Sequence, residues 1–439
     1  MSAPLRVAVV GSGPAGFYAA GALLAAGAEV DMVERLPTPW GLVRLGVAPD
    51  HPKIKSVSRA FEKIAAQPGF RFVGNVEVGR DLDHDELLDL YDAVLYAVGA
   101  QTDRRMGIPG EDLPGSRPAT EFVAWYNGHP DFQQLEFDLS GKRAVVIGNG
   151  NVAVDVARML ALTREELDPT DTTDAAIEAI AGSGIEEIVM VGRRGPAQAA
   201  FTTPELIELG ELAGADVVVD PADLEGAEPT DTNSERNLEV LRGYAARRPE
   251  GKPRRIVLRF FRSPVAILGD DRVTGIELVR NTLDENDRAV PTGETETLEC
   301  GIVFRSVGYQ GVALPGVPFD ESRGTIPNEG GRVGERVYAA GWIKRGPSGV
   351  IGTNKKDATE TVELLLGDLG DRPRLGRTSG DVDALLGKKN VKPVVYSGWA
   401  AIDERERSAG EPLGRPRVKL CSWEELLEAA ASAADRHPS

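Results

Sequence analysis

Short apolar runs alternate with segments of helical pattern along the chain, an order typical of folds with parallel strands. Near the start, Arg6–Val10 and Glu29–Val33 are predicted to be buried strands, and the helix between them, Phe17–Ala26, ends at Gly27. Further strands are predicted at Phe70–Val78, Ala93–Val98, Ile185–Val191, Ile302–Gly308 and Val337–Ala340. The pattern therefore predicts an α/β protein.

The segments between these strands differ in character. Prolines exclude a long helix from residues 37–53, and a proline-rich loop is expected between Gly110 and Arg143. Residues 256–307 alternate in β fashion, and the chain beyond Asp371 is predicted to be a surface extension of strand and helix. Helices are predicted at Ile54–Ala66, at Val152–Leu162, in an acidic insert near Arg164–Ile180, and from about Gly349.

A glycine fingerprint comes directly after the first strand. It consists of Gly11, Gly13 and Gly16. These glycines open a helix, and Glu34 closes the next strand. Such a strand–turn–helix unit presents free backbone N–H groups to a diphosphate. Because the Glu34 carboxylate can accept bonds from two free ribose hydroxyls but would repel a 2′-phosphate, the unit predicts an FAD site.

A second fingerprint differs from the first in the residues that close its next strand. Gly148, Gly150 and Ala153 come after another apolar run, and the next strand closes on Arg193 and Arg194. The acidic insert explains why these arginines trail the fingerprint by more than the usual ~20 positions. Guanidinium groups are fork-shaped donors suited to a 2′-phosphate. The second unit therefore predicts NADP(H), with an ordinary solvated arginine pair as the alternative.

Length and charge limit the class of protein. The 439 residues suggest about two or three domains. A net charge of −18 argues against nucleic acid or an anionic membrane surface as a general partner. No apolar run reaches the roughly 20 residues of a membrane span, and the start leads into a strand rather than a secretory signal. We expect a cytoplasmic protein, with a monomer favoured although the sequence is silent on oligomeric state.

The scarcity of cysteine excludes several redox groups. The chain has two cysteines, Cys300 and Cys421, far apart in sequence. A disulfide reductase needs a close cysteine pair, and an iron–sulfur cluster usually needs four thiolates. The four histidines show no zinc-ligand spacing, so no metal site is expected. If electrons pass singly, the one-electron carrier must be another molecule.

Three acid–base candidates lie outside the fingerprints. His51, in a proline-flanked loop, could position a nicotinamide or tune flavin protonation, and a surface histidine is the alternative. Glu205 and Glu208 come after Pro204 at a helix start, where carboxylates also complement the helix dipole. Because they are three residues apart they share one helix face, and could bind the nicotinamide ribose or carboxamide.

One aromatic residue and one basic segment also stand out. The ring of Trp342 could cover the nicotinamide or the flavin, or could be an ordinary core aromatic. The segment Arg236–Arg262 carries nine basic residues in an acidic chain. A solvated surface is the default interpretation of this segment, and a docking patch for an acidic electron carrier is the sharper one.

Five stretches are specific in combination: Val9–Tyr18, Pro37–Arg44, Gly46–Lys53, Val146–Ala153 and Gly341–Ile351. Together they resemble the adrenodoxin reductase-like family of ferredoxin–NADP⁺ reductases, especially its actinobacterial members. The resemblance implies a glutathione reductase-like α/β fold with two Rossmann-type dinucleotide-binding domains. We expect the NADP-binding domain, residues 102–308, to be inserted into an FAD-binding domain formed by residues 1–101 and 309–439, the latter including a C-terminal extension.

The resemblance also implies site residues. Those for FAD are Ala15, Glu34, Leu42, Val78, Trp342, Gly349, Val350 and Ile351. Those for NADP are Arg104, Asn149, Gly150, Asn151, Val152, Arg193, Arg194, Glu205 and Gly349. His51 and Glu208 match positions near the reaction centre. The chain departs from the wider superfamily at Trp342, which replaces a common acidic residue, so the FAD ribityl contact must come from elsewhere.

The activity that the resemblance implies is electron transfer. NADPH would pass a hydride to a tightly bound FAD, which would release single electrons to an acidic ferredoxin. Two other classes stay open from the residues alone. One is an FAD-dependent NADPH oxidoreductase acting on a quinone or small organic substrate, as a monooxygenase does. The other is a flavoprotein that senses nucleotide or redox state without catalysis.

Overall fold

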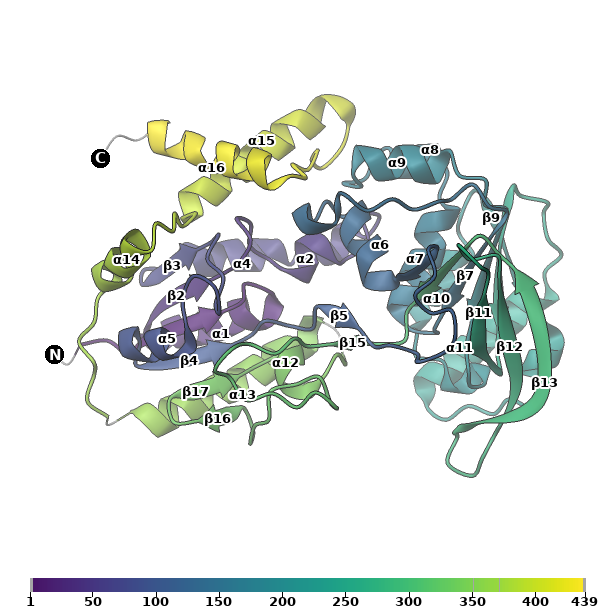
Figure 1. Ribbon diagram of the computed structural model, residues 1–439, viewed down its shortest axis with the longest axis horizontal. Helices are drawn as coiled ribbons and strands as arrows, with labels where there is room; N and C mark the ends of the chain where they lie inside the picture. Colours follow the sequence, from purple (N-terminus) through teal and green to yellow (C-terminus); the bar gives the residue numbers. More distant parts are fainter. Residues whose placement is uncertain (1–2, 350, 371, 437–439) are drawn as a thin grey trace. The chain divides into compact units, whose positions relative to one another are not determined.

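The structure is a computed structural model that describes residues 3–349, 351–370 and 372–436. The chain forms two units. Unit 1 comprises Met1–Thr102 and Tyr309–Ser439, and unit 2 comprises residues 103–308. Where the chain passes between the units, its two passages pair as short strands, β5 (Thr102–Asp103) and β15 (Tyr309–Gln310) (Figure 1).

Unit 1 is built on a six-stranded sheet in the order β16-β17-β4-β1-β2-β3, parallel except for the edge strand β16. On β1, Val7 and Val9 belong to one buried cluster, and Ala8 and Val10 belong to another on the opposite face. Because both faces are covered, most positions of β1, β2, β3 and β4 are apolar, and Asp31 of β2 pairs with Arg71 of β3. The strands are β16 (Arg332–Gly334), β17 (Val337–Ala339), β4 (Ala93–Tyr96), β1 (Arg6–Val10), β2 (Glu29–Val33) and β3 (Phe70–Val73).

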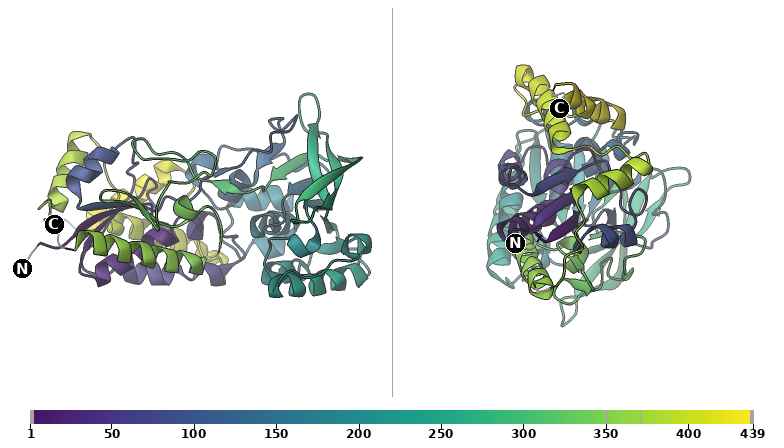
Figure 2. Two further views of the ribbon diagram at one scale, coloured as in Figure 1. Left: turned by 90° about the horizontal axis from the view of Figure 1, so that it is seen from below. Right: turned by 90° about the vertical axis from the view of Figure 1, so that its left-hand side faces the viewer.

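Helices cover this sheet. The helix after β1, α1, packs beside the long helix α13, and both lie along the sheet in Figures 1 and 2. A group of three helices forms the C-terminal extension. The bounds in unit 1 are α1 (Pro14–Ala25), α2 (Leu42–Leu45), α3 (Pro52–Lys55), α4 (Ser58–Ala65), α5 (His84–Leu90), α12 (Trp342–Arg345), α13 (Ile351–Leu369), α14 (Ser379–Lys388), α15 (Tyr396–Gly410) and α16 (Trp423–Arg436).

Three predictions for unit 1 need correction. The helix predicted at 54–66 is two helices, α3 and α4, because the chain turns between Lys55 and Ser58. The strand predicted at 70–78 ends at Val73, after which Gly74 makes only an isolated bridge to Val394. That bridge is also the nearest approach to a strand in the described residues after 371, so the strand expected in the extension is absent there.

Unit 2 has its own six-stranded sheet, in the order β6-β14-β7-β8-β10-β9, and every pairing in it is parallel. Helices pack on one face, where Ala144 and Val146 of β7 are buried. On the other face Val145 is buried with Ile276 of a three-stranded antiparallel sheet, β11-β12-β13. The strands are β6 (Ser116–Pro118), β14 (Ile302–Arg305), β7 (Arg143–Ile147), β8 (Glu187–Val191), β10 (Arg254–Arg259), β9 (Ala215–Val219), β11 (Arg262–Leu268), β12 (Gly275–Leu283) and β13 (Ala289–Glu299).

The helices of unit 2 include two that the sequence did not predict, α6 and α11. The proline-rich loop expected before β7 contains α6, whose Phe122, Trp125 and Tyr126 are buried in the core. Burial of three aromatic rings outweighs the local proline signals, because tertiary packing supplies most helical stability. The helices are α6 (Ala119–Tyr126), α7 (Asn151–Ala161), α8 (Arg164–Leu167), α9 (Asp174–Ala181), α10 (Thr203–Leu209) and α11 (Thr232–Ala246).

Two parallel sheets with covering helices confirm the predicted α/β class. In the described residues, every helix is too short or too polar to be a membrane span. In both sheets the fingerprint comes after the carboxyl end of an inner strand, β1 in unit 1 and β7 in unit 2. In open α/β sheets this edge is where ligands bind. These two turns are therefore the candidate ligand-binding sites of the fold.

Candidate functional site

The first fingerprint turn links β1 to α1 in unit 1. A Cβ added at Gly11 (φ +101°) would lie 2.5 Å from the Ala97 carbonyl oxygen. A Cβ at Gly16 would lie 2.0 Å from the Gly11 carbonyl oxygen. A Cβ at Gly13, in contrast, would meet none of the described atoms within 4 Å. The outer glycines are therefore fixed by packing, and the middle one borders open space suited to a diphosphate.

Two distant segments close against this turn. A Cβ at Gly41 (φ +49°) would lie 2.9 Å from the Gly13 Cα atom. A Cβ at Gly341 (φ +77°) would lie 2.6 Å from the Ala15 Cβ atom. Glycine is required at both positions, because a side chain would be strained by the backbone conformation and would also clash. Segments far apart in sequence therefore border one site.

Glu34 lies at the edge of the same turn. Its Oε2 atom accepts hydrogen bonds from the Ser12 N–H (3.0 Å) and the Ser12 hydroxyl (2.6 Å). Its Oε1 atom accepts one from the Leu36 N–H (3.0 Å). A carboxylate has about four acceptor positions, so capacity for a further donor remains. The side chain predicted to bind the FAD ribose is held in place beside the fingerprint.

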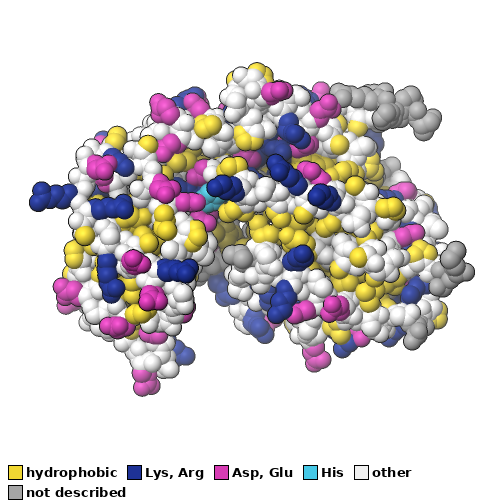
Figure 3. Space-filling view, turned by 180° about the vertical axis from the view of Figure 1, so that it is seen from behind, with side chains coloured by type: hydrophobic (Ala, Val, Ile, Leu, Met, Phe, Trp, Pro, Cys, Tyr) yellow, Lys and Arg dark blue, Asp and Glu magenta, His cyan; other side chains and the backbone are white. Residues whose placement is uncertain are grey.

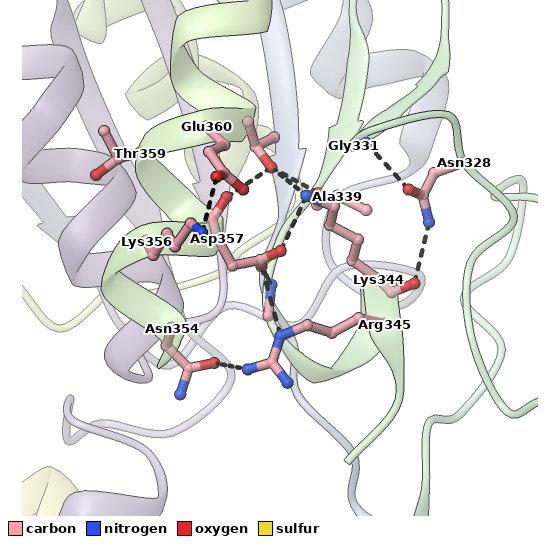
Figure 4. Close-up of polar contacts among 12 residues, drawn as sticks. Asn328, Gly331, Ala339, Lys344, Arg345, Asn354, Lys356, Asp357, Thr359 and Glu360 are labelled. Atoms are coloured by element: carbon pink, nitrogen blue, oxygen red, sulfur yellow. Dashed lines mark hydrogen bonds and ion pairs between the residues drawn. The ribbon is translucent and has the colours of Figure 1, made fainter. Parts of the chain in front are cut away.

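The turn from β17 into α12 is fixed by a buried carboxylate, Asp357 of α13 (Figure 4). The Gly341 N–H donates to Asp357 Oδ2 (2.5 Å), and Lys344 Nζ is 2.9 Å from Asp357 Oδ1. Lys344 also donates to the Thr361 hydroxyl (3.0 Å). Sequence reasoning missed Asp357, because its partners are in another element and no local pattern marks it.

Trp342, the second residue of this turn, has a buried indole N–H that finds no acceptor within the described part of the chain. Its ring centroid is 5.7 Å from that of Tyr309. The residue is only partly buried, which does not favour the ordinary core aromatic. A buried donor without an acceptor is costly, so a ligand acceptor at this turn would satisfy it.

The remaining positions predicted for FAD are in unit 1. Leu42 begins α2 and is exposed, and Val78 is buried and bridged to Leu82. Gly349 is exposed with φ +80°, and Ile351 begins α13. Val350 lies outside the described residues.

His51 precedes the short helix α3 in unit 1. Its N–H donates to the Ala48 carbonyl oxygen (3.0 Å), and its own carbonyl oxygen accepts from Lys55 (3.2 Å). These two bonds hold the backbone of the loop that carries His51.

The second fingerprint turn, in unit 2, repeats the geometry of the first. A Cβ at Gly148 (φ +133°) would lie 2.2 Å from the Ser306 carbonyl oxygen. A Cβ at Gly150 would meet none of the described atoms within 4 Å. At the end of β8, a Cβ at Gly192 would lie 1.6 Å from Asn149 Nδ2, so the Asn149 side chain lies against this backbone. The middle glycine again borders space for a diphosphate.

Polar side chains connect the start of α7 to the segment that leads into α10. The Ala200 N–H donates to the Asn149 carbonyl oxygen (2.9 Å), and the Thr202 N–H donates to Asn151 Oδ1 (2.8 Å). Val152 is half-buried against the core of unit 2. These bonds fix the fingerprint relative to the helix that carries Glu205 and Glu208.

Arg193 and Arg194 come directly after β8. Their backbone is held, because Asn281 Nδ2 donates to the Arg193 carbonyl oxygen (2.8 Å) and the Phe261 N–H donates to that of Arg194 (3.0 Å). Arg193 is exposed and Arg194 half-buried, and neither guanidinium is bonded to any described side chain of unit 2. Two fixed backbones with available guanidinium groups suit a 2′-phosphate. Arg104, also exposed, donates its N–H to the Gly308 carbonyl oxygen (2.9 Å).

A buried arginine pairs with carboxylates of α7 and α10. Arg158 of α7 donates to Asp155 Oδ1 (2.8 Å) and to Glu205 Oε2 (3.4 Å). Its distance to the Glu208 carboxylate is 3.8 Å. Sequence reasoning missed Arg158, although its place on α7, two helical turns after Asn151, puts both on one helix face. The contacts position Glu205 and Glu208 through more than the helix dipole.

Several arginines of the basic segment 236–262 are bonded to other groups of unit 2. Arg254 donates to the Leu160 and Leu162 carbonyl oxygens (2.8 and 3.0 Å), and Arg255 pairs with Glu187 (2.5 Å). Arg259 and Arg262 both pair with Glu296, at 3.0 and 2.8 Å. Figure 3 shows basic and acidic side chains interspersed on the face that it draws. These pairs favour a solvated, structural surface over a docking patch.

Comparison with known proteins agrees with this geometry. Residues 5–182 match the family model of pyridine nucleotide-disulphide oxidoreductases. The chain is 54% identical to the NADPH-ferredoxin reductase FprA of Mycobacterium tuberculosis, over 97% of this chain and 98% of the relative. It is 43% identical to the mitochondrial NADPH:adrenodoxin oxidoreductase of Arabidopsis thaliana, over 98% of this chain and 96% of the relative.

A solved structure gives the same result. Mycobacterium tuberculosis FprA in complex with NADPH matches with a TM-score of 0.94 and 52% identity, covering 98% of this chain and 100% of that one. These findings confirm the resemblance stated from the sequence and the fold class that it implied. The chain belongs to the family of NADPH-ferredoxin reductases.

Proposed function

We propose that this protein transfers electrons from NADPH through a bound FAD to a ferredoxin. FAD, when bound, takes a hydride as a pair of electrons and can return them one at a time. The predicted class, an FAD- and NADPH-dependent ferredoxin reductase, is confirmed by the family. The observation that carries the proposal is the contrast between Glu34 at one fingerprint and the pair Arg193 and Arg194 at the other.

We assign FAD to unit 1. The turn Gly11–Gly16 would hold the diphosphate, because the space beside Gly13 is open and the helix after it presents its N-terminus. Glu34 would accept bonds from the adenosine ribose, as its remaining acceptor position allows. The indole N–H of Trp342, together with Gly349 and with Ile351 at the start of α13, would contact the rest of the cofactor.

We assign NADPH to unit 2. The turn Gly148–Ala153 would hold the diphosphate beside Gly150. Arg193 and Arg194 would bind the 2′-phosphate, so the protein should reject NADH. Glu205, oriented by the buried Arg158, would bind the nicotinamide ribose. His51 and Glu208 stay proposed as groups near the reaction centre, where their task is orientation rather than proton transfer.

The partner that we propose is a ferredoxin, an iron–sulfur electron carrier. The two cysteines support an external carrier: Cys300 is buried, and burial raises its pKa to about 12. Burial likewise raises the pKa of Cys421 to about 11. Neither thiol is therefore suited to act as an internal relay, since the thiolate is the reactive form. A cytoplasmic location and a monomeric state stay predictions.

The test is rapid-mixing spectroscopy of the purified full chain. We expect a bound flavin spectrum that NADPH bleaches rapidly without oxygen, whereas NADH does so at least about 100-fold less efficiently. Addition of an oxidised ferredoxin should then restore the spectrum with two ferredoxins reduced per NADPH. A protein that binds no flavin, or flavin whose reoxidation requires an organic substrate and oxygen, would contradict the proposal.

A further inference from the structure

A buried ion cluster joins the C-terminal extension to the segment just after Gly41. Glu406 of α15 is fully buried, and Arg44 of α2 is 5% exposed. Arg44 donates two hydrogen bonds to the Glu406 carboxylate, at 2.8 and 2.5 Å. Arg417 (3.0 Å) and the Leu420 N–H (2.9 Å) donate to the same carboxylate. All of these groups belong to unit 1.

The cluster satisfies a charge that would otherwise be costly. Burial alone would raise the pKa of the Glu406 carboxyl, but Arg44 and Arg417 outweigh it and hold that pKa below its ordinary value. Glu406 is therefore charged, and four donors surround it. Removing one partner of such a pair leaves an uncompensated buried charge, which is more disruptive than loss of a surface ion pair.

Aromatic packing extends the same junction toward the FAD segment. The rings of Trp40 and Trp399 meet edge to face, with centroids 4.8 Å apart. The Arg44 guanidinium lies 5.2 Å from the Trp399 ring centroid, over its face. Lys419 donates to the Arg44 carbonyl oxygen (3.3 Å). We call Trp399, Glu406, Arg417 and Lys419 the C-terminal clamp.

The segment that the clamp holds borders the fingerprint directly. The Trp40 N–H donates to the Ser12 carbonyl oxygen (3.0 Å), and Gly41 packs on Gly13. Trp40 has φ +85°, a conformation that side-chain-bearing residues rarely adopt. Such a backbone persists only where its surroundings over-determine it. The clamp provides those surroundings, because Trp40 and Arg44 both contact it.

We propose that the C-terminal clamp, through the Arg44–Glu406 pair, holds the Trp40–Leu42 segment against the fingerprint turn and thereby sets how tightly the protein retains FAD. Arg44 and Glu406 are positioning residues, which act on the cofactor through Trp40 and Gly41. The inference rests on the proposed function in one respect, that FAD is the ligand of unit 1.

The experiment compares Glu406→Gln and Arg44→Met with a matched control. The control is Asp31→Asn, which weakens an ion cluster of similar burial in the same unit: Asp31 accepts from Arg6 (2.9 Å), Arg71 (2.7 Å) and the Tyr91 hydroxyl (2.7 Å), and Asp31 and Arg6 are 4% and 7% exposed. FAD is titrated into each apoprotein, and the melting temperature is measured with and without FAD. Arg44→Lys is the conservative variant, because it keeps the positive charge but loses the guanidinium group that donates two parallel hydrogen bonds.

We expect the dissociation constant for FAD to rise at least tenfold in Glu406→Gln and Arg44→Met, and less in Arg44→Lys. In Asp31→Asn the melting temperature should fall while the FAD dissociation constant stays within about twofold. A clamp with a merely structural role would give the opposite pattern, with all variants losing melting temperature and none losing FAD selectively. That result would overturn the inference.

A measurement on the unaltered chain tests the inference even if the variants fail to fold. Coupling between two sites is reciprocal, so FAD must stabilise the clamp as much as the clamp stabilises FAD. Removal of FAD should therefore speed amide hydrogen exchange at residues 399–420 at least tenfold, but leave α9 in unit 2 unchanged. A rate of amide exchange at residues 399–420 that does not change when FAD is removed would overturn the inference. A chain that binds no FAD at all would instead overturn the proposed function.

Discussion

The two fingerprint turns share their backbone geometry and differ in their surroundings. In unit 1, Gly41 and Gly341 from distant segments pack on the turn, and the Glu34 carboxylate already accepts three hydrogen bonds. In unit 2, Arg193 and Arg194 have fixed backbones but guanidinium groups with no described side-chain partner in that unit. The difference suits two kinds of ligand. A pre-organised site that is enclosed by packed segments favours a cofactor that stays bound. Side chains that are available on a fixed backbone favour a nucleotide that exchanges at every turnover.

The contrast between the two turns is tested most directly by filling the space beside each middle glycine. Gly13→Ala and Gly150→Ala add a Cβ that meets no described atom within 4 Å, so the apoprotein should keep its stability. The added methyl would occupy space that we assign to the diphosphate. We expect Gly13→Ala to lose FAD binding, and Gly150→Ala to keep a flavin that NADPH no longer reduces. Absorbance spectra and stopped-flow reduction measure both.

Gly334→Ala is the matched control for the glycine variants, because its Cβ also meets no described atom and it lies far from both fingerprints in sequence. It should behave as the unaltered chain. If Gly13→Ala and Gly150→Ala affected the same cofactor, the assignment of one nucleotide to each unit would be wrong.

The next largest effect tests the cofactor choice of unit 2. Replacing both Arg193 and Arg194 by Ala removes two charge-assisted donors, each worth about 1.5–3 kcal/mol. We expect KM for NADPH to rise roughly 100-fold or more, with kcat and the constants for NADH nearly unchanged. Steady-state kinetics with ferricyanide as acceptor provide the measurement. Equal losses with NADPH and NADH would show that the pair does not bind the 2′-phosphate.

A third prediction concerns the turn that Asp357 holds in unit 1. Asp357→Asn leaves the Lys344 ammonium without its buried partner, which should cost about 3–5 kcal/mol of the free energy of unfolding. The change should also loosen FAD, because the Gly341 N–H loses a charged acceptor. Denaturant unfolding of the apoprotein and FAD titration measure the two effects. Asp368→Asn, at a more exposed pair with Arg332, should cost less.

The smallest expected effect is a pH dependence in unit 2. Burial raises the pKa of Asp103 to about 6, although the Thr120 N–H and hydroxyl both donate to its carboxylate. A raised acid pKa means that the folded protein holds the proton more tightly than the unfolded chain. The stabilising effect of that proton is complete below about pH 4 and is lost as the pH rises through about 6, by at most about 3 kcal/mol.

Asp103→Asn should therefore flatten the pH dependence of unfolding between about pH 4 and 6. The exposed Asp112→Asn should retain the slope and serves as its control. Unfolding curves at a series of pH values give the result. A slope that survives in Asp103→Asn would assign the pH dependence to other groups.

Much of the central fold was readable from the sequence. β1 and β2 were predicted with their observed bounds, because most of their positions are apolar and a glycine lies close to each strand. The misses occurred where tertiary packing overruled a local signal. α6 forms in a proline-rich segment because its aromatic residues fill the core of unit 2. The predicted strand in the C-terminal extension is absent from the described residues because Val394 finds only one bridging partner, Gly74.

The candidate site divides in the same way. The sequence by itself determined the two nucleotide turns, because close backbone approach demands glycine and the choice between Glu34 and Arg193 is a matter of charge. Only the tertiary structure decided that Gly341, Asp357 and Glu406 support the first turn. Their partners lie on other elements, up to 362 residues away, and a buried charge is stabilised by whichever groups the fold brings to it, not by its neighbours in sequence.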